Sequence, residues 1–300
     1  MTRLGVDFGG TKIEAAVLAA DGSIAVRQRV DNPGNYAGAL NVLRDLIAAV
    51  EAEAGVRDAT IGIGLPGSIS PKTGLMRNAN SVWLNGKPFQ QDLEKVLSRP
   101  VRLENDANCF ALSEATDGAA AGAEVVFGAI LGTGCGGGVV VRGRTVEGVN
   151  RIGGEWGHTP LPWPTAVERG AHKCWCGRTD CLETWISGSA FSESYERAHH
   201  RKLRGDQIMS AVRLGEQAAT ECFDAYVQRL GRALAVICDI LDPDVIVFGG
   251  GMSNTSELYE RVPPIVAEYA FSDVFMTKIV PAEHGDSSGV RGAAWLWPQE

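Results

Sequence analysis

The chain has 300 residues, of which 45% are hydrophobic, and a formal net charge of -8. This length allows a large apolar core in two lobes, and the acidic balance, with no basic cluster, argues against a nucleic-acid partner. No signal peptide precedes the first predicted strand, and no apolar run reaches the roughly 18 residues that a membrane span requires. We therefore expect a cytoplasmic protein with no membrane partner.

The first predicted element is a hairpin with glycines at its tip. An apolar strand over residues 4–6 leads into Asp7-Phe8-Gly9-Gly10-Thr11-Lys12, and a second strand follows over residues 13–18. Because glycine has no Cβ, a phosphate can closely approach the backbone N–H groups and the threonine hydroxyl of such a tip. The motif is a candidate phosphate loop, although glycine pairs in strand turns more often form simple turns.

Helices and strands alternate after this hairpin. The sequence predicts a helix over about 40–50 that stops at Gly55, and a strand over residues 60–64. A rigid loop at Leu65-Pro66-Gly67-Ser68 and an extended polar stretch that includes Asn80 follow. The residues that could carry chemistry are expected in the middle of the chain.

Asp106 is the first candidate for that chemistry. It follows a predicted strand over residues 101–103 and stands with Asn105 at the start of a helix that runs toward Gly118. Backbone dipoles at a helix start keep a carboxylate ionised, which suits the proton acceptor of a phosphoryl transfer, where positioning matters more than basicity. The simpler alternative is that Asp106 and Asn105 only cap the helix.

The hairpin pattern returns about 120 residues after its first copy. A strand over residues 129–131 leads into Gly132-Thr133-Gly134, and a second strand follows over residues 139–141. Two such hairpins indicate a duplicated core in which each half holds one side of the nucleotide phosphates. The alternative is a chance pair in a chain with 37 glycines.

Three cysteines fall within eight residues, at Cys174, Cys176 and Cys181. In a reduced compartment this spacing favours metal ligation over disulfides. A tetrahedral zinc ion needs a fourth ligand, and His158 is the nearest upstream imidazole, with His172 as a rival. The segment therefore predicts a structural Zn²⁺ site.

Two carboxylates flank the predicted zinc loop, at Glu155 and Glu183. Carboxylate oxygens accept hydrogen bonds from sugar hydroxyls, so both residues are candidates for binding a sugar. The alternative is that they are solvated surface acids.

The remaining segments complete an alternating pattern. Residues 187–241 are expected to be mostly helical, and a buried strand over residues 245–248 ends in Gly249-Gly250-Gly251. A short helix follows Asp286. Strands that alternate with helices predict an α/β fold.

In combination these motifs resemble those of the ROK sugar kinases, in the right order and over essentially the whole chain. The segments that carry the resemblance are residues 7–12, 104–108, 132–134, 154–158 and 174–183. More narrowly, three segments resemble bacterial fructokinases of the manno(fructo)kinase type: residues 78–86, 157–163 and 284–292.

The resemblance implies a two-lobed, actin-like (ribonuclease-H-like) fold with a duplicated βββαβα core, closing on ATP and a hexose. A small lobe would comprise residues 1–118 and 286–300. A large lobe would comprise residues 119–285 and carry the zinc loop at about 158–183.

The same resemblance assigns roles to individual residues. Asp7 would face Mg²⁺, and Asp106 would accept the proton of the hexose 6-hydroxyl. The nucleotide would be held by Gly9, Gly10, Thr11, Lys12, Gly132, Thr133, Gly134, Gly249, Gly250 and Gly251. The sugar would be held by Gly67, Asn80, Asn105, Asp106, Glu155, His158 and Glu183. Zinc would be bound by His158, Cys174, Cys176 and Cys181, with one ring nitrogen of His158 on the metal and the other toward the sugar.

Fructose is the expected acceptor and mannose a side substrate, with glucose or an N-acetylhexosamine as the alternative within the same family. The resemblance also implies a homodimer. A repressor of this family would need a helix-turn-helix segment ahead of the first strand, and an actin-like ATPase switch would not need Glu155, His158 and Glu183.

Two departures from the family pattern affect the zinc prediction. Asp180 stands where the cysteine motif usually has glycine, and the interval between His158 and Cys174 is longer than in many members. An aspartate tolerates a positive φ better than most residues, so the turn can still form.

Overall fold

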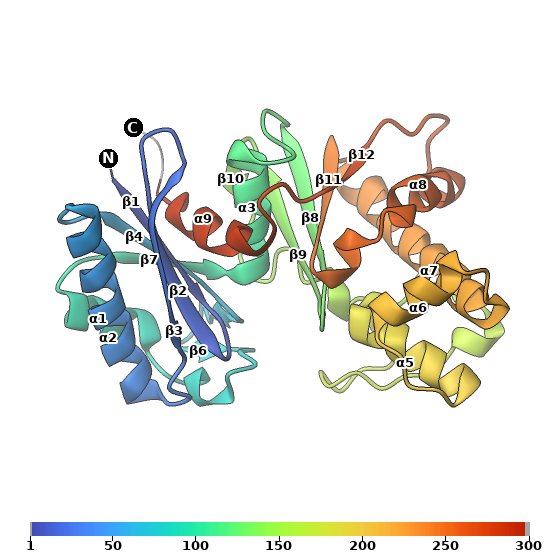
Figure 1. Cartoon of the computed structure of the whole chain (residues 1–300), viewed down its shortest axis with the longest axis horizontal. Coiled ribbons are helices and arrows are strands. Elements are labelled where there is room, and N and C mark those ends of the chain that lie inside the picture. Colours follow the sequence, from blue (N-terminus) through green and yellow to red (C-terminus); the bar gives the residue numbers. More distant parts are fainter. Residues whose placement is uncertain (1, 298–300) are drawn as a thin grey trace. The chain divides into compact units, whose positions relative to one another are not determined.

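The computed structural model describes residues 2–297, which form two compact units (Figure 1). Unit 1 comprises the chain up to residue 122, residues 138–154, and the chain from residue 283 onward. Unit 2 comprises residues 123–137 and 155–282. This division differs from the expected lobes mainly in residues 138–154, which pack with the N-terminal part of the chain.

Unit 1 is built on a five-stranded sheet in the order β3-β2-β1-β4-β7. Its strands are β1 (Arg3–Phe8), β2 (Lys12–Leu18), β3 (Ile24–Asp31), β4 (Thr60–Leu65) and β7 (Val101–Asn105). β1, β2 and β3 form an antiparallel meander, whereas β4 runs parallel to both β1 and β7. The phosphate-loop candidate is therefore the first hairpin of this meander.

Helices cover both faces of this sheet (Figure 1). One face carries α1 (Tyr36–Ala54) and α2 (Phe89–Leu97), and the other carries α3 (Asp106–Asp117) and α9 (Ser288–Ala294). α1 begins at Asn35, whose side chain accepts a hydrogen bond from the Gly38 N–H, and ends at Gly55 in the left-handed conformation. Both ends follow the usual capping chemistry, and Gly55 is the stop that the sequence predicts.

Short elements complete unit 1. Residues 66–87 carry the two-stranded sheet of β5 (Ser68–Ile69) and β6 (Met76–Arg77) and the 3₁₀ helix η1 (Val82–Leu84). The 3₁₀ helix η5 (Gly285–Ser287) leads directly into α9.

α9 lies unusually close to the sheet because the strands beneath it carry glycine. A Cβ on Gly5 of β1 would collide with the Val290 carbonyl oxygen, and one on Gly62 of β4 would collide with the Ala293 carbonyl oxygen. The helix is therefore in backbone contact with both central strands.

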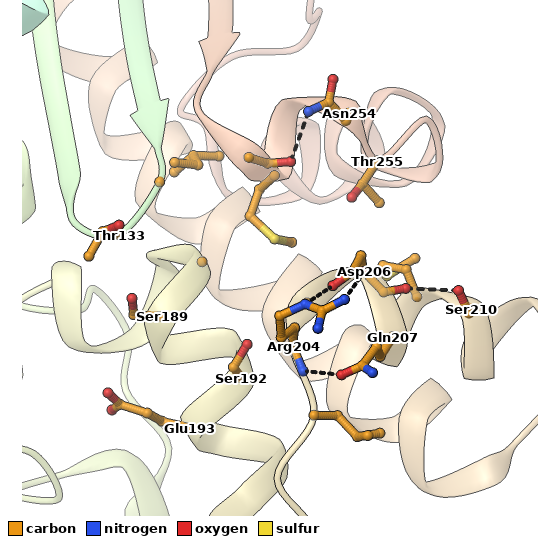
Figure 2. A pocket seen from close by; sticks show the side chains of 18 of the residues that line it. Thr133, Ser189, Ser192, Glu193, Arg204, Asp206, Gln207, Ser210, Asn254 and Thr255 are labelled. Atoms are coloured by element: carbon orange, nitrogen blue, oxygen red, sulfur yellow. Dashed lines mark hydrogen bonds and ion pairs between the residues drawn. The ribbon is translucent and has the colours of Figure 1, made fainter. Parts of the chain in front are cut away.

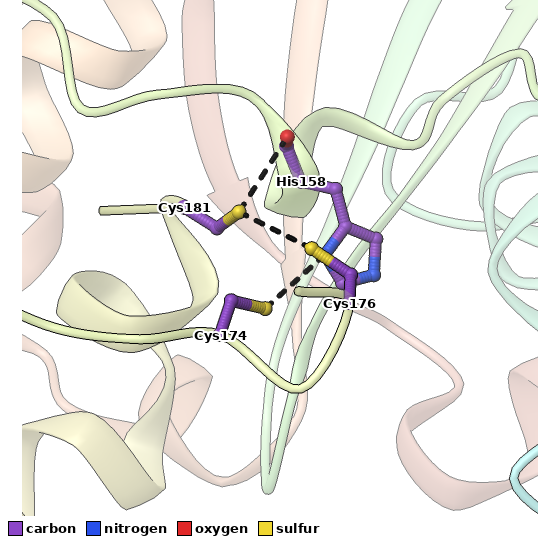
Figure 3. Close-up of side chains that lie close together, drawn as sticks. All are labelled: His158, Cys174, Cys176 and Cys181. Atoms are coloured by element: carbon purple, nitrogen blue, oxygen red, sulfur yellow. Dashed lines mark hydrogen bonds between the residues drawn. The ribbon is translucent and has the colours of Figure 1, made fainter. Parts of the chain in front are cut away.

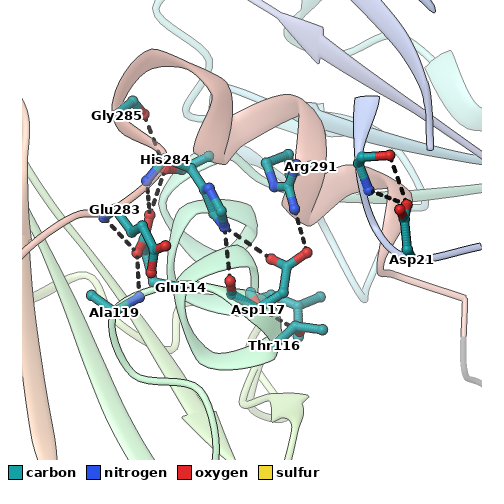
Figure 4. Close-up of polar contacts among 12 residues, drawn as sticks. Asp21, Glu114, Thr116, Asp117, Ala119, Glu283, His284, Gly285 and Arg291 are labelled. Atoms are coloured by element: carbon teal, nitrogen blue, oxygen red, sulfur yellow. Dashed lines mark hydrogen bonds and ion pairs between the residues drawn. The ribbon is translucent and has the colours of Figure 1, made fainter. Parts of the chain in front are cut away.

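A fully buried carboxylate, Glu114, ties α9 to α3 (Figure 4). Its oxygens accept hydrogen bonds from the backbone N–H groups of Ala119, Glu283 and His284 at 3.0 to 3.2 Å and from the Ser288 hydroxyl at 2.7 Å. Four donors compensate the loss of water around this carboxylate. The segment that enters α9 is thereby fixed to the end of α3.

Unit 2 repeats the strand order of unit 1. Its sheet has the order β10-β9-β8-β11-β12. When the strands of each sheet are numbered along the chain from the first strand of that sheet, both sheets have the order 3-2-1-4-5. The strands are β8 (Val125–Leu131), β9 (Cys135–Val141), β10 (Arg144–Thr145), β11 (Val245–Gly249) and β12 (Lys278–Pro281), with the end of β9 and all of β10 assigned to unit 1. The duplication predicted from the two hairpins is confirmed.

The remaining helices belong to unit 2. They are η2 (Trp156–His158), η3 (Ala166–Glu168), α4 (Glu183–Ile186), α5 (Gly188–His199), α6 (Gly205–Arg213), α7 (Gln217–Leu241), η4 (Gly251–Asn254) and α8 (Glu257–Tyr269). The mostly helical region expected at 187–241 is thus confirmed as α5, α6 and α7. Within the described residues, no helix is both long and apolar enough to cross a membrane.

The close packing of α9 yields a stability prediction. Gly62→Ala should lower the free energy of unfolding by about 1–3 kcal/mol, because the added methyl group must displace backbone rather than a flexible side chain. Urea unfolding measures this change. Gly205→Ala is the control, because its Cβ would meet side chains only at 3.6 and 3.7 Å. Equal stability of the two variants would contradict the packing argument.

Candidate active site

The first candidate phosphate loop is the turn between β1 and β2. Asn32, at the end of β3, holds it from the side: its side chain donates to the Gly9 carbonyl at 2.8 Å, and its N–H donates to the Thr11 carbonyl at 2.8 Å. Around Gly10 the space is open, since a Cβ there would meet only the Ser81 hydroxyl at 3.9 Å. The tip is thus fixed while its outer side stays accessible, which suits phosphate binding. Thr11 and Lys12 are exposed beside it.

Asp7, the next-to-last residue of β1, lies in a negatively charged environment. Burial, with the nearby charges of Asp106 and Glu14, raises the pKa of the Asp7 carboxyl from 3.8 to about 6, although Arg29 and Arg27 oppose this shift. Acidic oxygens gathered in this way attract a hard divalent cation, and Mg²⁺ prefers such ligands. These residues therefore fit the predicted magnesium ion, with Asp7 as the residue facing it.

Asn105 and Asp106 stand at the junction of β7 and α3. Asn105 is the N-cap, and its side-chain oxygen accepts hydrogen bonds from the N–H groups of Ala107 at 2.9 Å and Asn108 at 3.4 Å. Asp106 is the exposed first residue of the helix, and its Oδ1 accepts from the Ala107 N–H at 2.8 Å. Both side chains therefore take part in the cap, and Asp106 also presents its carboxylate at the positive end of the helix.

Gly67 and Asn80 lie in the loop beside this junction. The Asn105 side chain donates to the Gly67 carbonyl at 3.4 Å. Gly67 has a φ of +80° and leaves no room for a Cβ, which would lie 2.7 Å from the Ala79 nitrogen. Asn80 follows Ala79 and is exposed. Unit 1 thus brings Gly67 close to Asn105 and its neighbour Asp106. Asn80 directly follows Ala79, whose backbone nitrogen lies against Gly67.

In unit 2 the second candidate phosphate loop connects β8 and β9. The Gly188 N–H, at the start of α5, donates to the Gly132 carbonyl at 2.7 Å. A Cβ on Gly134 would lie 2.6 Å from Oε2 of Glu183, and the Cys135 N–H donates to the same oxygen at 3.1 Å. The loop is therefore in direct contact with one of the predicted sugar ligands, and Thr133 at its tip is exposed.

A pocket of about 1070 Å³ opens beside this loop (Figure 2). Gly132 and Thr133 line it on one side and residues of η4, including Gly251 and Asn254, on another. Residues of α5 and α6 complete it, among them Ser189, Ser192, Glu193, Arg204, Asp206, Gln207 and Ser210. Its size exceeds what one nucleoside needs.

The three glycines after β11 have different positions. Gly251 lines the pocket, as expected for a residue near the adenosine. Gly249 is the buried last residue of β11, and Gly250, with a φ of +76°, packs against the Leu131 and Gly132 backbone. The α5 and α6 residues of the pocket were missed, because their sequences carry no motif and only the fold brings them to the loop.

The predicted zinc ligands lie together (Figure 3). The ligand atoms of His158, Cys174, Cys176 and Cys181 all lie within 4.8 Å of one another. Sγ of Cys174 is 3.6 Å from Nδ1 of His158, and Sγ of Cys176 is 3.6 Å from Sγ of Cys181. Three sulfurs and one imidazole nitrogen at these separations fit a tetrahedral zinc ion.

His172, the rival ligand, lies elsewhere. Its ring packs on Trp185 with 4.2 Å between ring centroids, and its Nε2 is 3.3 Å from the Arg197 guanidinium. The geometry therefore favours His158 as the fourth ligand.

Asp180 adopts the backbone conformation of the glycine that it replaces, and it also contacts the long interval between His158 and Cys174. Its φ is +59°, the conformation that glycine adopts easily. Its carboxylate accepts hydrogen bonds from the N–H groups of Gly170 and His172, at the end of the long interval between His158 and Cys174. The aspartate thus fastens the longer loop to the cysteine turn.

The segment that carries Glu155 and His158 is fixed to the start of β9. The Trp156 indole donates to the Gly136 carbonyl at 2.8 Å, and Gly157 contacts the Cys135 carbonyl where a Cβ would collide. Glu155 itself is exposed. Unit 2 therefore gathers the segment of Glu155 and His158, and also Glu183, around the first residues of β9.

The chain is similar to known proteins over nearly its whole length. A model of the ROK family matches residues 3–300. The N-acetyl-D-glucosamine kinase of Pectobacterium atrosepticum is 40% identical over 297 residues, which cover 97% of this chain and 97% of that protein. The N-acetyl-D-glucosamine kinase of Vibrio cholerae is 39% identical over 297 residues, with coverages of 97% and 98%.

Solved structures agree with this comparison. The ROK hexokinase from Thermus thermophilus superposes with a TM-score of 0.87 at 32% identity and covers 99% of this chain and 97% of its own. The ROK glucokinase from Streptomyces griseus, solved with glucose and AMPPNP, gives a TM-score of 0.78 at 27% identity, with 99% of each chain covered. The expected actin-like α/β fold is confirmed.

The acidic environment of Asp7 predicts a pH-dependent gain of stability in Asp7→Asn. A carboxyl whose pKa rises from 3.8 to about 6 on folding destabilises the protein as the pH increases through this interval, because the folded state must then ionise a buried group that also lies near the charges of Asp106 and Glu14. Asp7→Asn should be as stable as the wild type near pH 4 and more stable at pH 7.5, by roughly 1–3 kcal/mol. Urea unfolding at both pH values tests this, with Asp45→Asn as the exposed control. A gain that does not change with pH would contradict it.

The cysteine cluster predicts a metal content. Purified protein should hold about one zinc ion per chain, and Cys176→Ser should lose it, because three ligands bind zinc more weakly than four. Metal analysis by plasma mass spectrometry measures the ratio. Cys222→Ser is the control, since Cys222 lies in α7, outside the cluster. Zinc-free wild-type protein would refute the site.

Proposed function

This chain belongs to the ROK family of sugar kinases, and we propose that it transfers the terminal phosphoryl group of ATP to the 6-hydroxyl of a hexose. The observation that carries the proposal is the full-length similarity to sugar kinases at 40% identity. The exposed Asp106 carboxylate at the start of α3 supports it.

The proposed mechanism assigns the acceptor proton to Asp106. As the new O–P bond forms, the 6-hydroxyl loses its proton to this carboxylate, and the bond from phosphorus to the ADP oxygen breaks. Backbone dipoles of α3 keep Asp106 ionised until then. Mg²⁺, facing Asp7, would neutralise charge on the phosphates.

Each unit supplies its own set of candidate binding residues in this proposal. The glycine-rich tips at 9–11 and 132–134 hold the phosphates, and the pocket with Gly251 holds the adenosine. The sugar hydroxyls are held by Asn105, Glu155, His158 and Glu183, with Gly67 and Asn80 beside them. His158, Cys174, Cys176 and Cys181 would hold a structural zinc ion, which would fix the orientation of His158.

N-acetyl-D-glucosamine is the better-supported acceptor, because both whole-length relatives above carry that activity in their names. Fructose, the acceptor expected from the local resemblance, is the second candidate. Of the three segments that resemble fructokinases, residues 284–292 form η5 and the start of α9, which pack on the sheet and on Glu114. The resemblance of residues 284–292 to fructokinases therefore reflects the packing of unit 1 more than the choice of sugar.

The proposal predicts hexose-dependent release of ADP that Asp106→Asn reduces by about 10²–10⁴-fold in kcat. A coupled assay over N-acetylglucosamine, N-acetylmannosamine, fructose, mannose and glucose measures it. Binding of ATP, followed by calorimetry, should persist in the variant because the pocket with Gly251 is unchanged.

Asp45→Asn, at an exposed position of α1, is the matched control and should keep full activity. Turnover retained by Asp106→Asn would remove Asp106 as the base. Absence of turnover with every hexose would refute the proposed function itself.

A further inference from the structure

Trp175 is a large hydrophobic residue that the fold leaves in water. It stands between two zinc-ligand candidates, Cys174 and Cys176, and 72% of its surface is exposed. Burying a tryptophan side chain is strongly favourable, so a solvated one of this extent is unusual unless its polar edge or its ring face has a partner. The polar edge of Trp175 contacts Glu183, and its ring contacts His158.

The polar edge of Trp175 contacts Glu183. The indole Nε1–H donates to Oε1 of Glu183 at 2.7 Å, while the other oxygen, Oε2, accepts from the Cys135 N–H at 3.1 Å. One donor on each oxygen fixes the orientation of the carboxylate. Each carboxylate oxygen can accept a second hydrogen bond, so both can still receive a sugar hydroxyl.

The ring of Trp175 contacts His158. The two rings meet edge to face, with 5.0 Å between their centroids. A single indole therefore touches both His158 and Glu183, the two candidate sugar ligands that come from different segments of unit 2.

The surroundings of Trp175 leave room for a ligand. It lines a pocket of about 480 Å³ together with Thr133, Gly134 and Glu183. A sugar ring presents hydroxyls at its edge and C–H groups on its face, and such a C–H face packs well on an exposed indole. The carboxylate and the indole thus offer the two kinds of contact that a hexose requires.

We propose that Trp175 is a specificity-determining residue of the acceptor site: its N–H orients Glu183 and its ring packs on the hexose. This inference rests on the proposed function of the chain as a hexose kinase. It identifies the acceptor as a sugar recognised in part through its C–H face, in addition to its hydroxyls.

The test compares three variants over the five-sugar panel. Trp175→Ala removes both contacts, Trp175→Phe keeps a ring but removes the N–H donor, and Trp163→Phe is the matched control. Trp163 is 50% exposed in the preceding loop and packs on Tyr269, away from Glu183. Zinc content and the KM for ATP are measured for each variant to exclude general damage.

Trp175→Ala should raise the KM of the preferred hexose and reduce its kcat/KM relative to the poorest active sugar by about tenfold or more. Trp175→Phe should show a smaller loss, because packing survives without the hydrogen bond to Glu183. Trp163→Phe should match the wild type. An unchanged ratio of kcat/KM values in both Trp175 variants would overturn the inference.

Tryptophan fluorescence provides a second measurement if Trp175→Ala fails to fold. Saturating hexose should change the emission of the wild type and of Trp163→Phe, and this change should be lost in Trp175→Phe. A full response in Trp175→Phe would also overturn the inference. Inactivity of the wild type toward all five sugars would instead count against the proposed function, so the two failures are distinguishable.

Discussion

The contact on which unit 1 depends is the close approach of α9 to the backbone of its sheet. Gly5 of β1 and Gly62 of β4 allow this approach, and Gly292 of α9 in turn contacts the Cys109 carbonyl of α3. Glycine at all three positions brings β1, α9 and α3 into one tightly packed set. Asp7 stands near the end of β1 and Asp106 at the start of α3, so this packing fixes the positions of the two acids.

The resulting concentration of acidic groups has an energetic consequence for the apoprotein. Burial and the neighbouring charges of Asp106 and Glu14 raise the pKa of Asp7 to about 6, which means that the folded state opposes its ionisation. A fold selected only for stability would avoid this arrangement. A bound divalent cation would reverse the effect, because it favours the charged carboxylate. The raised pKa of Asp7 is thus consistent with a carboxylate that binds a cation.

Local chemistry accounts for what the sequence could predict. Glycine-rich turns, the helix stop at Gly55 and the cysteine spacing each follow from a few neighbouring residues, and the structure contains them. The sequence left two choices open, between His158 and His172 and between two roles for Asp106. The first choice depended on a contact outside the local sequence, the packing of His172 on Trp185. The catalytic role of Asp106 stays a prediction, because Asn105 and Asp106 both accept a hydrogen bond from the Ala107 N–H.

Residues without a local motif could not be predicted. Asn32 supports the first hairpin from β3, and the pocket beside Thr133 takes its lining from α5 and α6. Trp175 stands between two cysteines and carries no motif of its own, yet its indole meets Glu183 and His158. The cysteines and Asp180 hold the loop, which leaves the intervening position available to contact the ligand. A loop held this firmly can vary one side chain without losing its shape, and such a position is suited to setting acceptor preference.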